Sequence, residues 1–310
     1  MRQNQDIVIL GVFVADNSYR AARAPRMGET IMGKSFALGP GGKGSNQAVA
    51  CARVGGRAHF ITRLGRDPFA DMALATWAGA GVIPSITQHD DSYTGAAYIF
   101  VEDATGDNAI IVCPGVAGTI SVADIEARAS LISGAAVFLT QLEQPMDAAL
   151  HGLALARAGG AVTILNPAPA ADLPDGMLAL CDYVTPNESE AAALTGLPVA
   201  SVAEATRAAE ALLAAGVGTA IITLGENGAL FHDGRSATHV PAFDAGPVVE
   251  TTGAGDAFNG GFAAALARGD DPLEAVRFGC ATAAISVTRP GTAPSMPSLD
   301  EVRALLARAR

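Results

Sequence analysis

The chain has 310 residues with 31 acidic and 20 basic side chains, and its formal net charge is −11. This acidic balance, without a cluster of Lys and Arg, disfavours a nucleic-acid partner, because phosphate backbones are bound mainly by clustered cations. Hydrophobic residues make up 50% of the chain and charged residues 16%, which excludes disorder as the main state and indicates a compact globule.

Short apolar runs alternate with Ala- and Leu-rich helical stretches along the chain, which is typical of βα units around a mostly parallel sheet. In chain order, the apolar runs predict strands over residues 7–14, 58–62, 135–139, 161–165, 183–185 and 219–224. The helical stretches predict helices over residues 45–54, 69–80, 147–158, 203–215, 254–267 and 273–287. We therefore expect an α/β fold that forms a single domain over residues 1–310.

Two stretches depart from this alternation of strands and helices: residues 28–38, and residues 94–100 with 108–112 around a polar turn. They predict antiparallel strands of a small second sheet. Because no helix accompanies this sheet, its apolar face must be covered by a substrate, by the main domain or by a second subunit. We expect a lid that lies within about residues 15–40 and 92–113 and that also forms a homodimer.

No apolar stretch approaches the roughly 20 residues of a membrane span, because Gly, Pro, Arg or Asp interrupts each one. The N-terminal apolar run lacks the charged leader and cleavage site of a secretory signal. The four cysteines, Cys51, Cys113, Cys181 and Cys280, have no metal-binding spacing and are interpreted as small buried hydrophobes. We expect a cytoplasmic protein without membrane contact.

A glycine-rich loop, Gly39-Pro-Gly-Gly-Lys-Gly-Ser-Asn46, leads into a predicted helix. Three of its glycines match G-x-G-x-x-G, but the next strand ends without the acidic residue of a dinucleotide site, and the Lys-Ser/Thr pair of a P-loop is missing. The glycines let the backbone approach a ligand, and Lys43 and Asn46 are suited to binding hydroxyls or a phosphate. The alternative is a tight turn with an exposed lysine.

A second pair of glycines precedes a predicted helix in Glu250-Thr-Thr-Gly-Ala-Gly-Asp256. These glycines free backbone N–H groups to point at one spot where the helix dipole is positive, so the segment predicts an anion hole. Asp256 is then one of two things. It is a carboxylate that only stabilises the start of the helix, or it is a base that accepts the proton of a substrate hydroxyl as the hydroxyl oxygen attacks phosphorus.

Polar residues follow several predicted strands, at the edge of the sheet where α/β proteins bind ligands. Asn187 and Glu190 lie one helical turn apart, where a carboxylate holds Mg²⁺ through its water shell or simply caps the helix. Asp16 accepts hydrogen bonds from two sugar hydroxyls or is only a turn residue. Further polar strand ends carry Glu143, Asn166, Thr223 and Gly225.

Together these segments resemble the ribokinase, or PfkB, family of carbohydrate kinases, and its ribokinase branch most closely. The resemblance covers nearly the whole chain through residues 41–48, 141–143, 166–169, 185–190, 223–225, 253–260 and 291–295. It implies a three-layer α/β/α fold with a β lid that pairs in a homodimer. It also implies transfer of the γ-phosphoryl group of MgATP to a hydroxyl of a pentose such as ribose.

The resemblance assigns roles to individual positions. Asp256 matches the catalytic base, and Gly253, Ala254 and Gly255 match the anion hole. The sugar-contacting positions are Asp16, Gly42, Lys43, Asn46 and Glu143, and the nucleotide-contacting positions are Asn187, Thr223, Gly225, Gly228 and Gly255. Glu190 matches the position linked to Mg²⁺, while Glu250 and Ser295 match positions near an activating K⁺.

Two residues depart from the pattern of the family. Val14 stands where ribokinases carry an Asn that bonds the sugar, and an isopropyl group cannot replace that hydrogen bond. Glu250 stands where they carry a cation-binding Asp, and its extra methylene alters the reach of the carboxylate. The alternatives are therefore a kinase for another sugar or a nucleoside, such as a ketohexose, deoxyribose or an adenosine-like compound, and a non-catalytic sugar-binding protein.

Overall fold

The computed structural model describes residues 5–308, and within them the larger sheet has nine strands. Their spatial order is β13 (Ala237–Val240), β12 (Ala229–His232), β11 (Thr219–Thr223), β10 (Tyr183–Val184), β9 (Val162–Leu165), β8 (Val137–Thr140), β1 (Asp6–Leu10), β4 (Arg57–Gly65) and β5 (Ile83–His89). Neighbours from β11 to β5 are parallel, whereas β12 and β13 are antiparallel additions at one edge.

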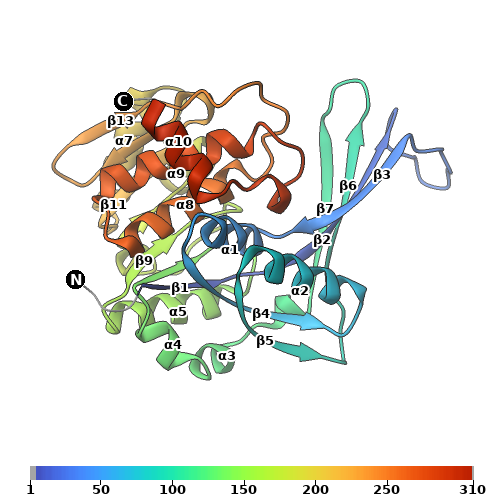
Figure 1. Cartoon of the computed structure of the whole chain (residues 1–310), viewed down its shortest axis with the longest axis horizontal. Helices are drawn as coiled ribbons and strands as arrows, with labels where there is room; N and C mark the ends of the chain where they lie inside the picture. The colour runs from blue at the N-terminus through green and yellow to red at the C-terminus, as the bar shows by residue number, and fades with distance from the viewer. Residues whose placement is uncertain (1–4, 309–310) are drawn as a thin grey trace.

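Both faces of this sheet are buried, which explains the continuous apolar run of β1. Ile7 and Ile9 belong to one apolar core, and the alternating residues Val8 and Leu10 belong to the other. The first core is built with α1 (Lys43–Arg53), α2 (Pro68–Ala80), α8 (Ala254–Arg268), α9 (Pro272–Ser286) and α10 (Leu299–Arg308). The second is built with α3 (Val122–Glu126), α4 (Ala129–Ser133), α5 (Met146–Ala158), α6 (Glu188–Thr195) and α7 (Val202–Ala214). The three-layer α/β/α prediction is therefore confirmed (Figure 1).

A second sheet projects from the main body (Figure 1). It contains β3 (Ser35–Gly41), β2 (Val14–Ala21), β6 (Thr94–Glu102) and β7 (Asn108–Gly115), in that order. The β2–β3 and β6–β7 pairs are antiparallel as expected, but β2 and β6 pair in parallel.

Three expectations from the sequence are wrong. A single strand over residues 7–14 is not formed, because the chain leaves the main sheet after Leu10 and enters the second sheet at Val14. Gly11 lies at this crossing, where a Cβ would be 2.3 Å from Gln141 Oε1. Residues 28–34 lie outside β3, which begins at Ser35; Gly28 takes a left-handed φ of 80° in a turn where the Glu29 N–H donates to Arg26 O at 3.0 Å. Cys113 is exposed on β7, whereas the other three cysteines are buried.

Several elements have no counterpart in the sequence-based expectations, among them β5, β12, β13 and α10. The described residues contain no helix that is both long and apolar enough to cross a bilayer.

Candidate active site

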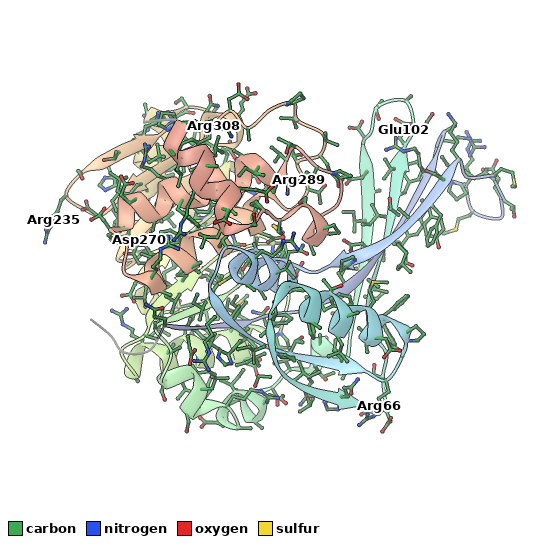
Figure 2. All side chains as sticks on the ribbon, in the orientation of Figure 1. Arg66, Glu102, Arg235, Asp270, Arg289 and Arg308 are labelled. Atoms are coloured by element: carbon green, nitrogen blue, oxygen red, sulfur yellow. The ribbon has the colours of Figure 1, made fainter. Side chains whose placement is uncertain are left out.

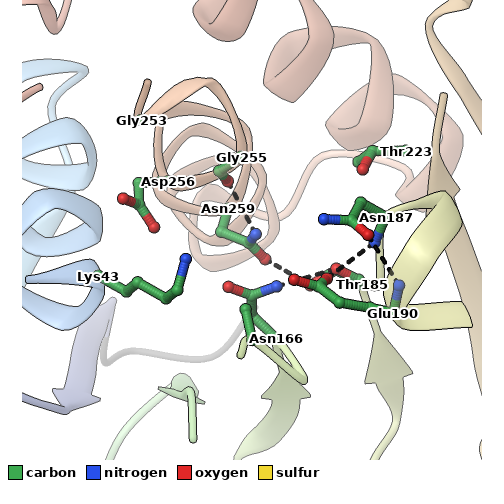
Figure 3. Close-up of a pocket in the computed structure, with 11 residues that line it drawn as sticks. Lys43, Asn166, Thr185, Asn187, Glu190, Thr223, Gly253, Gly255, Asp256 and Asn259 are labelled. Atoms are coloured by element: carbon green, nitrogen blue, oxygen red, sulfur yellow. Dashed lines mark hydrogen bonds between the residues drawn. The ribbon is translucent and has the colours of Figure 1, made fainter. Parts of the chain in front are cut away.

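A cavity lies between the N-terminus of α8 and the carboxyl ends of the parallel strands (Figure 3). Its volume is about 140 Å³, well below the roughly 300–1,000 Å³ of a pocket for a complete organic ligand. It therefore matches the reacting end of a larger binding site. The lining residues are Lys43, Asn166, Ala168, Thr185, Asn187, Glu190, Thr223, Gly253, Gly255, Asp256 and Asn259.

The N-terminus of α8 leaves backbone N–H groups free at the cavity. Gly253 takes a φ of 83°, and no side chain caps the helix. The Ala254 N–H donates to Thr251 O at 3.1 Å, so the next amides, those of Gly255 and Asp256, are the first-turn donors at the cavity. A Cβ on Gly255 would meet no atom within 4 Å, so the space in front of this turn is open. Backbone N–H groups and the helix dipole together favour negative charge there.

Asp256 is a buried carboxylate with two amide donors. Its Oδ2 accepts a hydrogen bond from Asn46 Nδ2 and its Oδ1 accepts one from Gln47 Nε2, each at 3.0 Å. Burial raises the pKa of Asp256, while the Lys43 charge and these two hydrogen bonds oppose the rise. Arg66 and Arg235, in contrast, lie at the periphery of the molecule (Figure 2), where charged side chains are usually found.

Two further carboxylates lie close to Asp256. Burial raises the pKa of Asp16 to about 6, and the charges of Asp256 and Glu250 add to the rise. Burial also raises the pKa of Glu143 to about 7, against the opposing effects of Lys43, whose backbone N–H donates to Glu143 Oε2 at 2.8 Å. An excess of acids around one lysine thus favours neutral, hydroxyl-rich ligands that donate hydrogen bonds.

Lys43 begins α1 and its side chain reaches the cavity (Figure 3). Burial alone would lower its pKa, but the charges of Asp256, Glu143 and Glu190 raise it above the ordinary value. Lys43 therefore stays protonated beside the first turn of α8. Gly42, just before it, has a φ of 87°, and a Cβ there would lie 2.6 Å from Val12 O.

Asn187 and Glu190 form a helix cap and also line the cavity. Asn187 Oδ1 accepts from the Glu190 N–H at 2.8 Å, and Glu190 Oε2 accepts from the Asn187 N–H at 2.9 Å. The capping interpretation is thus correct, and it places the Asn187 and Glu190 side chains beside Thr223, with which Asn187 forms a parallel bridge. Burial raises the pKa of Glu190. Within residues 5–308, no three His, Cys, Asp or Glu side chains gather as a metal-ligand set.

Other predicted positions lie outside the set that lines this cavity in the described chain. Gly225 and Gly228 bound the turn after β11, and a Cβ on Gly228 would lie 2.1 Å from Val240 O, which explains the glycine. Glu250 and Ser295 both form hydrogen bonds with backbone groups of the loop 291–295. Glu250 Oε2 accepts from the Gly291 N–H at 2.8 Å, and the Ser295 hydroxyl donates to Thr292 O at 2.7 Å.

Sequence reasoning missed four polar residues at the site. Thr185 Oγ1 donates to Asn259 Oδ1 at 2.7 Å, and both line the cavity. Thr292 Oγ1 donates to Pro40 O at 2.9 Å and packs against Gly253, so it joins the glycine-rich loop to the start of α8. Gln47 bonds Asp256 directly. The sequence did offer one signal for Gln47: it is a polar residue among Ala and Val residues on a buried helix, where a polar side chain needs a partner.

Comparison with known proteins assigns the chain to a family. The family model for pfkB family carbohydrate kinases matches residues 4–299. The chain belongs to this family. A ribokinase of Haemophilus influenzae is 35% identical over 304 residues, which are 98% of this chain and 99% of that protein. A deoxyribokinase of Salmonella typhi is 34% identical over 298 residues, 96% of this chain and 97% of that protein.

The family has the same fold in solved structures. The structure of an Arabidopsis thaliana ribokinase complexed with ribose and ATP superposes with a TM-score of 0.91 at 30% identity, over 98% of this chain and 99% of that one. The predictions of a carbohydrate kinase of this family and of a phosphotransferase with an alcohol acceptor are confirmed.

Proposed function

We propose that this protein transfers the γ-phosphoryl group of MgATP to a hydroxyl of a free pentose such as ribose. The observation that carries the proposal is the position of Asp256, a buried carboxylate within the same turn as the anion-binding amides and beside Lys43. A base and a phosphoryl site then share one cavity, as in-line transfer to an alcohol requires. The ribose and ATP in the related Arabidopsis structure support this choice of reactants.

Asp256 takes the proton of the acceptor hydroxyl. At the same time the oxygen of that hydroxyl attacks the γ-phosphorus, and ADP leaves. The turn of Gly253, Ala254 and Gly255 receives the negative charge that develops on the phosphoryl oxygens, because the free amides of Gly255 and Asp256 and the helix dipole are already oriented. Lys43 adds a positive charge from α1, on the opposite side of the cavity from Asn187 and Thr223 (Figure 3).

The sugar is held by Asp16, Gly42, Lys43, Asn46 and Glu143. Asn46 donates its amide hydrogen to Asp256, and its Oδ1 is buried with no hydrogen-bond partner among the described residues. A buried acceptor without a partner is costly, so a hydroxyl of the sugar is expected to donate to it. The carboxylates of Asp16 and Glu143 accept further hydroxyl hydrogens.

The nucleotide is held by Asn187, Thr223, Gly225, Gly228 and Gly255. The Oδ1 atom of Asn187 accepts in the helix cap, so its Nδ2 donors are the side-chain group that remains for a phosphate. Glu190 would contact the water shell of a Mg²⁺ bound with ATP, since one carboxylate suits an ion that keeps most of its waters, and the ion would neutralise the phosphates. This fits a cavity whose described residues include no complete ligand set.

A monovalent cation such as K⁺ is proposed at the loop 291–295, where Glu250 and Ser295 supply a carboxylate and a hydroxyl oxygen. The loop contacts Gly253 through Thr292, so an ion there would stiffen the anion hole. Activity measured in K⁺ against choline salts tests this, and equal rates would remove the cation from the proposal.

The second sheet, within a single domain, is proposed to act as a lid and as a homodimer interface. The strand register places Tyr19, Phe36, Leu38, Tyr98 and Ile111 on one face, all between 39% and 63% exposed. Asp16 lies on the opposite face, toward the sugar. A contiguous aromatic face of this kind fits a second copy of the same chain. We also propose a cytoplasmic location for the protein.

A second candidate substrate is a pentose that lacks one hydroxyl, such as 2-deoxyribose. Val14 is two residues before Asp16 on β2, so both side chains lie on the face toward the sugar, and Val14 offers no hydrogen bond there. The relationship to a deoxyribokinase supports this alternative.

An assay of ADP release coupled to NADH oxidation, run over ribose, 2-deoxyribose, ketohexoses and nucleosides, tests the proposal. We expect pentoses to have the highest kcat/KM, and 2-deoxyribose to be within about tenfold of ribose, since a missing partner removes the advantage of the hydroxyl. Turnover of a nucleoside or ketohexose above every pentose would overturn the pentose assignment. Absence of ADP release with all of them would favour a non-catalytic sugar-binding protein.

A further inference from the structure

Gln47 lies on α1, is fully buried and contacts Asp256. Its Nε2 donates one hydrogen to Asp256 Oδ1 and the other to Asn166 Oδ1, both at 3.0 Å. A buried glutamine whose two amide hydrogens both point at the site is unlike a packing residue, because an apolar side chain would fill the same volume without these partners.

On the side away from Asp256, the Gln47 amide is bonded to a second glutamine, Gln141. Gln47 Oε1 accepts a hydrogen bond from Gln141 Nε2 at 2.5 Å, and Gln141 is also fully buried. The carbonyl end of Gln47 therefore faces Gln141, and only the NH₂ end can face Asp256. On the other side, Asn166 Nδ2 donates to Thr185 O at 3.0 Å, so Asn166 also presents its carbonyl oxygen to Gln47. Gln141 Oε1 has no hydrogen-bond partner among the described residues, so the direction of these bonds is fixed at the Asn166 end.

Close packing of α1 and α8 brings Gln47 and Asp256 within reach of each other. Gly260 lies one turn after Asp256, and a Cβ there would be 2.6 Å from both Gln47 O and the Ala50 Cβ. The absence of a side chain at this position lets the two helix backbones approach, so a three-carbon amide from α1 meets a short carboxylate on α8.

We propose that Gln47 is a positioning residue for phosphoryl transfer and that Gln141 orients it, so that the pair holds Asp256 as a carboxylate aimed at the acceptor hydroxyl. The inference rests on the proposed function, in which Asp256 is the base. The NH₂ group stabilises the ionised form, because a protonated Oδ1 would lose this acceptor role. If the side-chain amide of Gln47 were rotated by half a turn, its carbonyl oxygen would face Asp256. That orientation would favour the neutral acid, which cannot take a proton.

The other charged groups around Asp256 come from several elements, so the effect of Gln47 must be separated from theirs. They are Lys43 on α1, Asp16 on β2, Glu143 after β8 and Glu190 on α6, while Glu250, before α8, acts on Asp16. None of them is changed by a substitution at Gln47.

The test compares Gln47→Met, Gln141→Met and the control Gln144→Met. Gln144 is a buried amide near the same strand end, and it bonds Thr140 Oγ1 and Gln141 O and not Gln47. For Gln47→Met we expect kcat at pH 7 to fall by about 10- to 100-fold and the sugar KM to stay within about twofold. The acidic limb of its kcat profile should move to higher pH. Gln141→Met should show a smaller shift in the same direction, and Gln144→Met no shift.

A folded Gln47→Met enzyme, checked by circular dichroism, with wild-type kcat and an unmoved acidic limb would overturn the inference. If Gln47→Met does not fold, Gln141→Met decides, and an unmoved limb there also overturns it. Adding Gln47→Met to Asp256→Asn should lower the residual rate by less than twofold, because the carboxylate that Gln47 holds is gone. Full activity of Asp256→Asn alone would instead refute the base in the proposed function, a result distinct from a failure of Gln47.

Discussion

Asn46 Nδ2 donates to Asp256 Oδ2 across 3.0 Å, although the two residues are 210 positions apart in the chain. The bond joins the first turn of α1 to the first turn of α8. It therefore couples the predicted sugar loop to the predicted anion hole, because both hold the same carboxylate. The two helix backbones come close at Gly260 of α8, where a Cβ would be 2.6 Å from Gln47 O.

Asp256→Asn removes the proposed proton acceptor and keeps the size of the side chain. We expect turnover to fall by about 10²- to 10⁴-fold while the sugar still binds, because the base acts only during the transfer. Coupled ADP release measures kcat, and calorimetry measures sugar binding. The control Asp300→Asn changes an exposed acid in the first turn of α10 and should leave both unchanged. Near-normal turnover of Asp256→Asn would show that another group takes the proton.

Val14→Asn should shift the preference between sugars. An amide at this position on β2 would lie on the same face as Asp16 and restore a donor toward a sugar hydroxyl. We expect the ratio of kcat/KM for ribose to that for 2-deoxyribose to rise by at least about tenfold. An unchanged ratio would mean that Val14 does not approach the sugar. The thermal midpoint should be measured as well, because a buried amide without a partner destabilises the fold.

Glu143 should make the unliganded protein less stable as the pH rises. Its folded pKa, about 7, is above the ordinary value of 4.5, so its contribution is fully present below about pH 4.5 and is lost as the pH rises through about 7. The loss is at most roughly 3 kcal/mol. Urea unfolding at pH 5 and pH 8 should show a smaller difference for Glu143→Gln than for the wild type. Glu210→Gln, at an exposed position on α7, should retain the wild-type difference.

Gly260→Ala should damage both stability and turnover. The new Cβ would lie 2.6 Å from Gln47 O and from the Ala50 Cβ, so α1 and α8 must separate. We expect a loss of about 1–3 kcal/mol in unfolding free energy, and a lower kcat because Asp256 moves. As a control, Gly79→Ala in α2 meets no atom within 4 Å and should stabilise the protein by about 0.5–1 kcal/mol. Wild-type stability of Gly260→Ala would contradict this account of helix packing.

Tyr98→Asp places a charge on the aromatic face of the second sheet, where Tyr98 lies 5.5 Å from Tyr19 between ring centroids. If this face pairs two copies of the chain, light scattering should show a dimer for the wild type and a monomer for the variant. Ile83→Asp, at an exposed apolar position on β5 of the main sheet, should remain a dimer. A wild type that stays monomeric at all concentrations would rule out the interface.

The sequence by itself determined the main features of the fold, because they depend on local periodicity and on turn residues. Most predicted strands and helices correspond to observed elements, and the glycine-rich segments mark the loops before α1 and α8. The proposed chemistry of the ligand also follows from residue types, since a Gly-Ala-Gly-Asp turn at a helix start offers backbone amides to an anion and carries a carboxylate.

Only the tertiary structure decided which residues meet. The crossing at Gly11, which divides the predicted strand 7–14 between two sheets, depends on packing against Gln141 and Gly44, both distant in the chain. The amide chain from Gln141 through Gln47 to Asp256 is equally non-local. Neither leaves a local pattern, because hydrogen bonds between elements depend on the distance between backbones, and that distance is set by the close packing of the whole core.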